Sequence, residues 1–178
     1  HTTNVRVVTE EDLGKGFLRD RDYTDVDGLI TNVPGITLAT FYADCVPLFF
    51  VDPVHKAIGL SHSGWKGTVG KIGKVTVEEM TKQYGTDPKD VLAAIGPSIC
   101  QSCYEVSEDV ILQFREAFEK QFWPELFYAK ENGKYQLNLW RANELIFEEA
   151  GILREHYSTT NVCTCCNPGY LFSHRASH

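Results

Sequence analysis

The segment from residue 28 to residue 62 consists of short apolar stretches separated by turn signals, and this pattern constrains the fold more than any other part of the chain. The stretches are rich in β-branched and aromatic residues, and Pro34-Gly35 and Asp52-Pro53 interrupt them. Buried strands joined by tight turns have this pattern. We therefore expect strands at 28–32, 36–43, 46–52 and 57–62, and a further buried strand at 91–96.

Three longer segments place apolar residues at the spacing of a helix face and predict α-helices. Residues 67–84 form the first, although two internal glycines lower its helix propensity. Residues 107–122 form the second, and the third runs from Asn138, a good N-cap, to Gly151, a good residue to follow a helix. Strands and helices mix without strict alternation, so we expect an α/β or α+β fold with mixed β-sheets flanked by helices.

Length and composition fit one globular domain. The 178 residues are 43% hydrophobic and 23% charged, which is ordinary for a soluble protein. The net charge of −7 argues against a nucleic-acid partner, because phosphate binding favours a basic face. No apolar run approaches the ~18 residues needed to span a bilayer, and no signal peptide opens the chain. We expect a cytoplasmic domain over residues 1–178 that is incomplete at both ends, since it starts at His1 and not at Met.

Six cysteines include two C-x-x-C pairs, Cys100 with Cys103 and Cys163 with Cys166. We expect reduced thiols, because the chain is of medium size and lacks a secretion signal. Paired C-x-x-C units are a strong signal for structural zinc, but the gap between these two is far longer than the roughly 15–20 residues usual for such a site. Buried structural thiols are therefore the favoured interpretation, with a four-cysteine zinc site and a redox pair as alternatives.

Cys45 and His62 stand 17 positions apart, each next to a predicted strand. Neighbouring strands could bring the thiol and the imidazole together. Such a pair suits nucleophilic catalysis or a borderline-soft metal such as zinc or copper, and a buried structural pair is the plain alternative. A metal site needs a third ligand, for which the candidates are His1, His55, His174 and Asp44.

The segment 61–74 is rich in glycine and lysine. It is not a P-loop, because the second glycine of that motif would come one position late and Ile72 replaces the required hydroxyl residue. A glycine-rich turn before a helix, with Lys66 and Lys71 nearby, could hold an anion on its backbone N–H groups. A plain turn with solvated lysines is the alternative.

Five motifs follow one another along nearly the whole chain. They are DVDGLITN (25–32), ADCVPLFF (43–50), HSGWKGT (62–68), IGPSICQSCYEV (95–106) and CTCCNPGYLFSHR (163–175). In sequence and order they resemble the YfiH-like family, whose members were formerly described as laccase-domain or multicopper polyphenol oxidases and are now described as purine nucleoside phosphorylases. Two positions depart from the family pattern: Cys100 stands where glycine is usual, and Ala176 replaces a second arginine.

The resemblance implies a single YfiH-like domain built as a layered sandwich of mixed sheets and helices. It implies phosphorolysis of adenosine, inosine, guanosine and methylthioadenosine, together with deamination of adenosine. The partners would be small molecules, a nucleoside and phosphate. The family holds a metal, usually taken as zinc, on residues that correspond to His1, Cys45 and His62 of this sequence.

Four further residues are candidates for the same site. Asp44, next to a metal ligand, would handle a proton or orient that ligand. Arg175 and Lys66 would face phosphate or ribose as cations, with Gly67 beside Lys66.

Other classes of function stay open. The older family description implies a copper-dependent polyphenol oxidase, but a multicopper site needs clustered histidines and the six here are scattered. A metal-free hydrolase would use Cys45 as nucleophile and His62 as base. A zinc-stabilised binding module would use the same ligands without catalysis.

Overall fold

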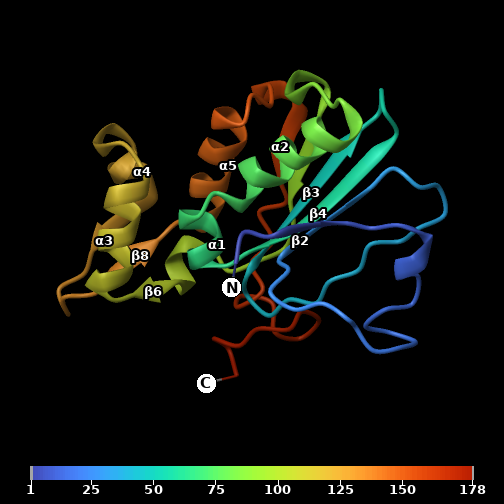
Figure 1. Cartoon of the computed structure of the whole chain (residues 1–178). Coiled ribbons are helices and arrows are strands. Elements are labelled where there is room, and N and C mark those ends of the chain that lie inside the picture. The colour runs from blue at the N-terminus through green and yellow to red at the C-terminus, as the bar shows by residue number, and fades with distance from the viewer. Residues whose placement is uncertain (1, 178) are drawn as a thin grey trace.

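A computed structural model of the chain describes residues 2–177 and contains two β-sheets with helices packed against them (Figure 1). The strands are β1 (Val5–Val7), β2 (Gly28–Thr31), β3 (Val46–Asp52), β4 (Ala57–Ser63), β5 (Leu92–Ile95), β6 (Glu105–Val106), β7 (Phe127–Ala129), β8 (Tyr135–Leu137) and β9 (Tyr157–Thr159). The α-helices are α1 (Trp65–Val69), α2 (Ile72–Tyr84), α3 (Glu108–Ala117), α4 (Trp123–Leu126) and α5 (Leu139–Glu149). Short 3₁₀ helices span Glu10–Asp12, Pro88–Asp90, Gln101–Cys103, Lys120–Phe122 and Arg154–His156.

The larger sheet has the strand order β1-β2-β4-β3-β5-β9. The two outer pairs are parallel and the inner pairs are antiparallel. In its centre, β3 and β4 form a hairpin whose register runs from Asp52 opposite Ala57 to Val46 opposite Ser63. The open end of this hairpin therefore holds the residues that precede β3 and follow β4.

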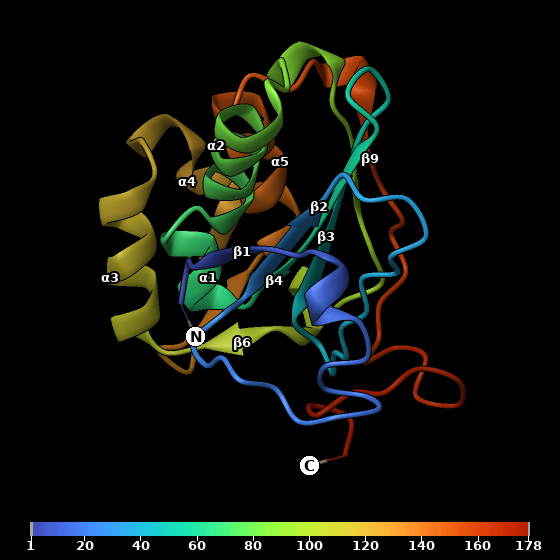
Figure 2. The same ribbon diagram turned by 45° about the vertical axis from the view of Figure 1, so that its right-hand side comes forward.

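Helices α2 and α5 cover one face of this sheet (Figure 2). Phe50 of β3 points into the core between them, where its ring meets the edge of Phe147 at a centroid distance of 5.5 Å. Gly73 lets α2 approach the sheet, because a Cβ at this position would lie 3.2 Å from Leu48 Cδ1. The glycine that weakens the helix in isolation thus serves its packing.

The smaller sheet has the order β6-β8-β7 and lies with α3 and α4 at one side of the molecule (Figure 1). The Arg115 guanidinium of α3 lies 5.6 Å from the Trp123 ring centroid and 5.7 Å from that of Phe127. These contacts tie α3 to α4 and β7. Among residues 2–177, no helix is long and apolar enough to cross a bilayer.

The α/β class with mixed sheets and flanking helices is confirmed. The segment 36–43 is not a strand, contrary to the prediction, because β1 and β4 already flank β2 while β4 and β5 flank β3. Its apolar side chains do not enter a sheet, and Phe41 is 87% exposed. The expected helix 67–84 is divided into α1 and α2 at Lys71, whose φ of 57° is left-handed.

Candidate active site

The open end of the β3–β4 hairpin brings Cys45 and His62 together. Pro47 pairs with His62 in the register, so Cys45 lies beside the end of β4. A Cβ at Gly64 would lie 3.2 Å from Cys45 Sγ and 3.9 Å from both Cε1 and Nε2 of His62. The thiol and the imidazole edge therefore share one small space, which the absence of a side chain at residue 64 keeps open.

Asp27 orients the His62 ring. Its Oδ1 lies 3.0 Å from His62 Nδ1, and its backbone oxygen accepts the His62 N–H at 2.7 Å. Burial raises the pKa of Asp27, but hydrogen bonds from the Thr2 backbone N–H and from His62 outweigh it and bring the pKa below its usual value. The ionised carboxylate accepts a hydrogen bond from Nδ1–H, and Nε2 faces the space beside Gly64 that Cys45 also borders, as in carboxylate–histidine–metal arrangements.

Asp27 is a site residue that the sequence analysis missed, although it stands within the quoted motif DVDGLITN. Tyr42 is another. Its ring lies 5.6 Å from the His62 ring, centroid to centroid, and burial raises the pKa of its hydroxyl to about 12. A neutral aromatic ring thus packs on the imidazole.

Cys45 lies in surroundings that disfavour a free thiolate. Burial, followed by the charges of Asp44 and Asp27, raises the pKa of its thiol. An activated cysteine nucleophile requires the opposite shift, from a nearby positive charge. These surroundings favour Cys45 as a ligand of a cation over Cys45 as an unassisted nucleophile.

The Asp44 carboxylate connects the hairpin to the C-terminal segment. Its Oδ1 accepts the Thr164 hydroxyl at 2.7 Å, and its Oδ2 accepts the Arg175 backbone N–H at 2.7 Å. The residue is 8% exposed and has a left-handed φ of 87°. Both carboxylate oxygens are engaged, which supports an orienting role for Asp44 more than a role in proton transfer.

Arg175 lies at the rim of a surface cavity of about 320 Å³. Its guanidinium donates to the backbone oxygens of Glu105 at 3.1 Å and Cys103 at 3.4 Å, and it lies 5.6 Å from the Tyr104 ring centroid. Burial, and after it the negative charge that Cys45 can carry, raise the pKa of Tyr104 to about 12, so its hydroxyl stays neutral. The cavity is lined by Trp65, Tyr104, Glu105, Val106, Ser107, Val110, Lys134 and Arg175.

Lys66 and Gly67 belong to α1, which begins directly after Gly64. Lys66 Nζ lies 5.5 Å from the Trp65 ring centroid. A Cβ at Gly67 would lie 3.1 Å from the His62 backbone oxygen, so a glycine lets the helix start close to the end of β4.

The remaining histidine candidates differ in their position. His1 lies outside the described residues. His55 is in the turn at the far end of the hairpin, where its Nδ1 lies 2.8 Å from Asp52 Oδ2, so it does not reach Cys45 or His62. His174 directly precedes Arg175 in the C-terminal segment.

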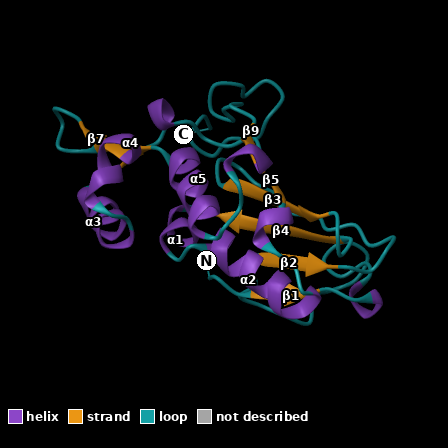
Figure 3. Ribbon diagram, turned by 90° about the horizontal axis from the view of Figure 1, so that it is seen from above, coloured by secondary structure: helices purple, strands orange, loops and turns teal. Residues whose placement is uncertain are grey.

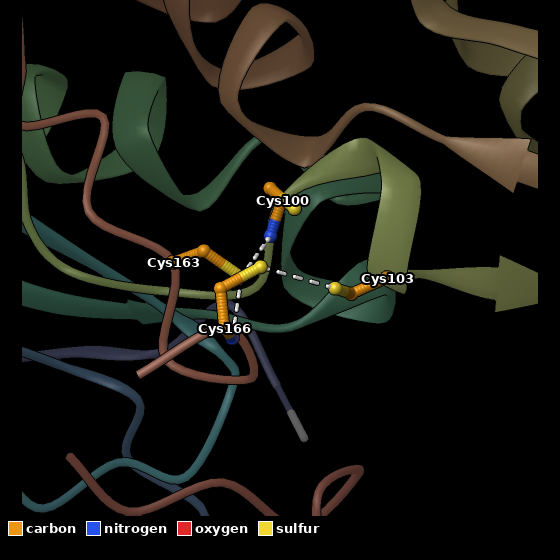
Figure 4. Close-up of side chains that lie close together, drawn as sticks. All are labelled: Cys100, Cys103, Cys163 and Cys166. Carbon is orange, nitrogen blue, oxygen red and sulfur yellow. Dashed lines mark hydrogen bonds between the residues drawn. The ribbon is translucent and has the colours of Figure 1, made fainter. Parts of the chain in front are cut away.

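Four cysteines outside this site also meet. The Sγ atoms of Cys100, Cys103, Cys163 and Cys166 all lie within 4.8 Å of one another (Figure 4). The sequence analysis favoured separate buried thiols, because the gap between the pairs is long. The structure instead folds the two C-x-x-C segments against each other. Burial raises the pKa of Cys163, but hydrogen bonds from the Cys100 and Cys166 N–H groups outweigh that effect and lower the pKa to about 7.

The sequence of the chain is similar to those of known proteins. A family profile described as "Multi-copper polyphenol oxidoreductase laccase" matches residues 1–178. Purine nucleoside phosphorylase YlmD of Bacillus subtilis is 40% identical over 98% of this chain and 63% of its own length. Adenosine deaminase RL5, from an unknown prokaryotic organism, is 38% identical over 84% of this chain and 56% of its own length.

The fold also matches a solved structure. The crystal structure of YfiH from Bacillus licheniformis superposes with a TM-score of 0.90 and 34% identity, over 98% of this chain and 66% of that one. This chain spans less than two thirds of the length of the two curated relatives. The profile match over the whole chain, with these two similarities, shows that the chain belongs to the YfiH-like, laccase-domain family.

Proposed function

We propose that this chain carries the metal-dependent centre of a purine nucleoside enzyme, which phosphorolyses adenosine, inosine, guanosine and methylthioadenosine and deaminates adenosine. The main support is the convergence of Cys45 Sγ and His62 Nε2 beside Gly64, with Nδ1 of His62 bound by Asp27. Two relatives carry the names purine nucleoside phosphorylase and adenosine deaminase.

Zinc is the metal that we assign to this centre. A thiolate with an imidazole is a borderline-soft donor set that suits zinc, and the Asp27–His62 hydrogen bond is the outer support that such ligands have. His1, outside the described residues, is the proposed third ligand. Zinc held by three protein ligands supplies a Lewis acid with an open position, where the pKa of a bound water falls to ~7.

The surrounding residues suit the binding of a nucleoside and phosphate. Arg175 provides a cation at the rim of the cavity, fixed by two backbone carbonyls, and Lys66 provides a second cation on α1. Trp65 and Tyr104 line the same cavity and supply the aromatic residues against which a purine would pack. Asp44 holds the backbone of Arg175, so it positions that cation for an anionic ligand.

Copper-dependent oxidation of phenols has weaker support. A multicopper centre requires clustered imidazole ligands. Within residues 2–177, the group of metal-binding side chains with three or more members consists of cysteines alone. The experiment described next therefore includes a copper-loaded sample that is incubated with a phenol.

The test uses the whole protein, loaded with zinc and incubated with adenosine and phosphate. Inosine reports deamination, while adenine and ribose-1-phosphate report phosphorolysis. Cys45→Ala and His62→Ala should each abolish both reactions. His55→Ala is the matched control, since it removes a histidine from the far end of the same hairpin. Absence of turnover, or turnover that survives both site substitutions, would refute the proposal.

A further inference from the structure

The four-cysteine cluster is formed by two loops that are far apart in the sequence. Cys103 Sγ and Cys166 Sγ lie 3.5 Å apart although 63 positions separate them. Each C-x-x-C unit contributes both of its sulfurs, so the sulfurs converge from two sides (Figure 4). Backbone contacts fix the approach: the Ser98 N–H donates to the Val162 oxygen at 3.1 Å, and the Thr164 N–H donates to the Ser98 oxygen at 3.2 Å.

From this arrangement we propose a second metal site, a structural zinc ion bound by Cys100, Cys103, Cys163 and Cys166. Zinc with four thiolates is tetrahedral with bonds of about 2.3 Å, which places neighbouring sulfurs about 3.8 Å apart. The mutual separations within 4.8 Å fit that geometry. An iron–sulfur cluster inserts several iron and sulfide atoms between the cysteines and needs wider spacing.

Backbone hydrogen bonds support thiolates at this position. The N–H groups of Cys100 and Cys166 both donate to Cys163 Sγ, at 3.3 and 3.4 Å. Hydrogen bonds of this kind favour the charged form of a sulfur. Several thiolates so close together repel one another, and a divalent cation at their centre would turn that repulsion into attraction.

A disulfide is the main rival for the same sulfurs. Disulfides join sulfurs in pairs, one pair or two, so they do not require all four sulfurs to lie within 4.8 Å of one another, as they do here. A bond between Cys103 and Cys166 would also require their sulfurs to approach from 3.5 Å to about 2.05 Å. Four sulfurs that all lie within 4.8 Å of one another favour one shared ion.

The site would act on the fold and not on the substrate. Four protein ligands leave the ion no open position, which is the mark of a structural zinc. The ion would hold the segment around Cys163 and Cys166 against the loop around Cys100 and Cys103. The same C-terminal segment supplies Thr164 and Arg175 to the Asp44 carboxylate. Zinc at the cluster would thereby fix the position of Arg175 at the cavity.

The four cysteines share no ligand with the Cys45–His62 centre, and the proposal does not require the proposed function to hold, so the test removes that centre first. In a Cys45→Ala/His62→Ala variant, purified metal should amount to one zinc per chain. Adding Cys103→Ser or Cys166→Ser should remove that zinc. Cys165→Ser is the matched control, because this cysteine lies in the same segment but outside the cluster, and it should leave the zinc in place.

X-ray absorption on the Cys45→Ala/His62→Ala variant gives a second readout that needs no substitution in the cluster. The expected spectrum shows zinc with four sulfur neighbours at about 2.3 Å. Iron in place of zinc, zinc with nitrogen or oxygen neighbours, or zinc content unaffected by Cys103→Ser and Cys166→Ser would overturn the proposal. So would a metal-free chain in which mass spectrometry finds a disulfide among the four cysteines.

Discussion

Gly64 and Asp27 contribute to the candidate site through their contacts with Cys45 and His62. Gly64 keeps the space between Cys45 and His62 free, and Asp27 holds the imidazole from behind. The motif HSGWKGT contains the glycine, and DVDGLITN contains the carboxylate. Their roles depend on the distance between motifs in space, which the sequence alone does not supply.

We expect Gly64→Ala to weaken zinc binding at the Cys45–His62 centre by about 10-fold or more, since this positioning is comparable to that of outer-shell partners. The new Cβ would lie 3.2 Å from Cys45 Sγ, which is tighter than most Cβ contacts, and the ordinary φ of −72° excludes backbone strain as the cause. Competition with a chromophoric chelator measures the affinity. Gly169→Ala is the control, because its Cβ would meet no atom within 4 Å. Equal affinities of the two variants would contradict the assignment.

We expect Asp27→Asn to weaken zinc binding at the same centre by roughly 10–100-fold, because a neutral amide no longer raises the basicity of His62. The same chelator titration measures the change. Asp25→Asn is the matched control. Its side chain lies outside the site, and asparagine tolerates its left-handed φ of 54°. If Asp25→Asn weakened binding as much as Asp27→Asn, the hydrogen bond to His62 would not be the cause.

The β3–β4 hairpin is the element on which both proposed ligands depend. Its turn is closed by Asp52, which is fully buried and accepts the Val54 and His55 N–H groups at 2.9 and 3.1 Å. At the other end, α1 is tied to β4 by a buried network in which Ser63 and Thr68 both contact the Asn143 side chain of α5. The hairpin is therefore fixed at both ends by polar groups that have partners.

The buried Asp52 in the β3–β4 turn predicts that the free energy of unfolding depends on pH. Burial raises the pKa of Asp52. Hydrogen bonds to its carboxylate outweigh that effect and bring the pKa below its usual value, and they include those from the backbone N–H and from the ring of His55. The stabilisation from the ionised group is therefore complete above the unfolded pKa of ~3.9 and is lost as the pH falls through the lower folded value.

Asp52→Asn should lower the free energy of unfolding by about 1–3 kcal/mol at neutral pH. It should also flatten the fall in stability that we expect of the unsubstituted protein as the pH drops below about 4. Urea unfolding at a series of pH values measures both effects, with the exposed Asp20→Asn as control. A variant whose stability falls as steeply as that of the unsubstituted protein would refute the role of this carboxylate.

At the scale of the whole molecule, the sheet and the helices are arranged so that distant loops meet at one end. Figure 3 shows the strands of the large sheet side by side, with α2 and α5 across them and α3 beside the small sheet. The chain between the two C-x-x-C units contains α3, α4 and α5, which fold back and return it to Ser98. A long gap in sequence is thus compatible with a short distance between the cysteines.

Removal of zinc from the cluster should loosen the C-terminal segment. We expect chelation of the Cys45→Ala/His62→Ala variant to speed tryptic cleavage after Arg175 several-fold, because the backbone of this residue would lose its hold on Asp44. Cleavage after Lys89, in a 3₁₀ helix outside the cluster, is the internal control. Mass spectrometry over time measures both sites. Equal acceleration at the two sites would indicate general unfolding and contradict a local effect.

The elements that the sequence predicted well are those with strong local patterns. The strands at β2, β3, β4 and β5 and the helix α5, with its Asn138 cap, follow from runs and periodicities of single segments. The strands β1, β7, β8 and β9 have three residues each, which is too short for a periodic signal. The partners of β1 and β9, which are β2 and β5, also lie far from them in the sequence. The sequence analysis favoured buried thiols over a four-cysteine site, because the distance between the two C-x-x-C units depends on the path of three intervening helices.

The β3–β4 hairpin joins neighbouring segments, so it can form before the cysteine cluster does. Cys45 and His62 stand 17 positions apart, and a hairpin that brings such residues together forms within about 1–10 μs. The cysteine cluster closes over 63 positions, which costs about 1 kcal/mol more in loop entropy. During synthesis from the N-terminus, the hairpin is complete about 100 residues before Cys163 is made. The thiol and imidazole of the candidate site can therefore meet while the chain that would fix Arg175 is still unmade.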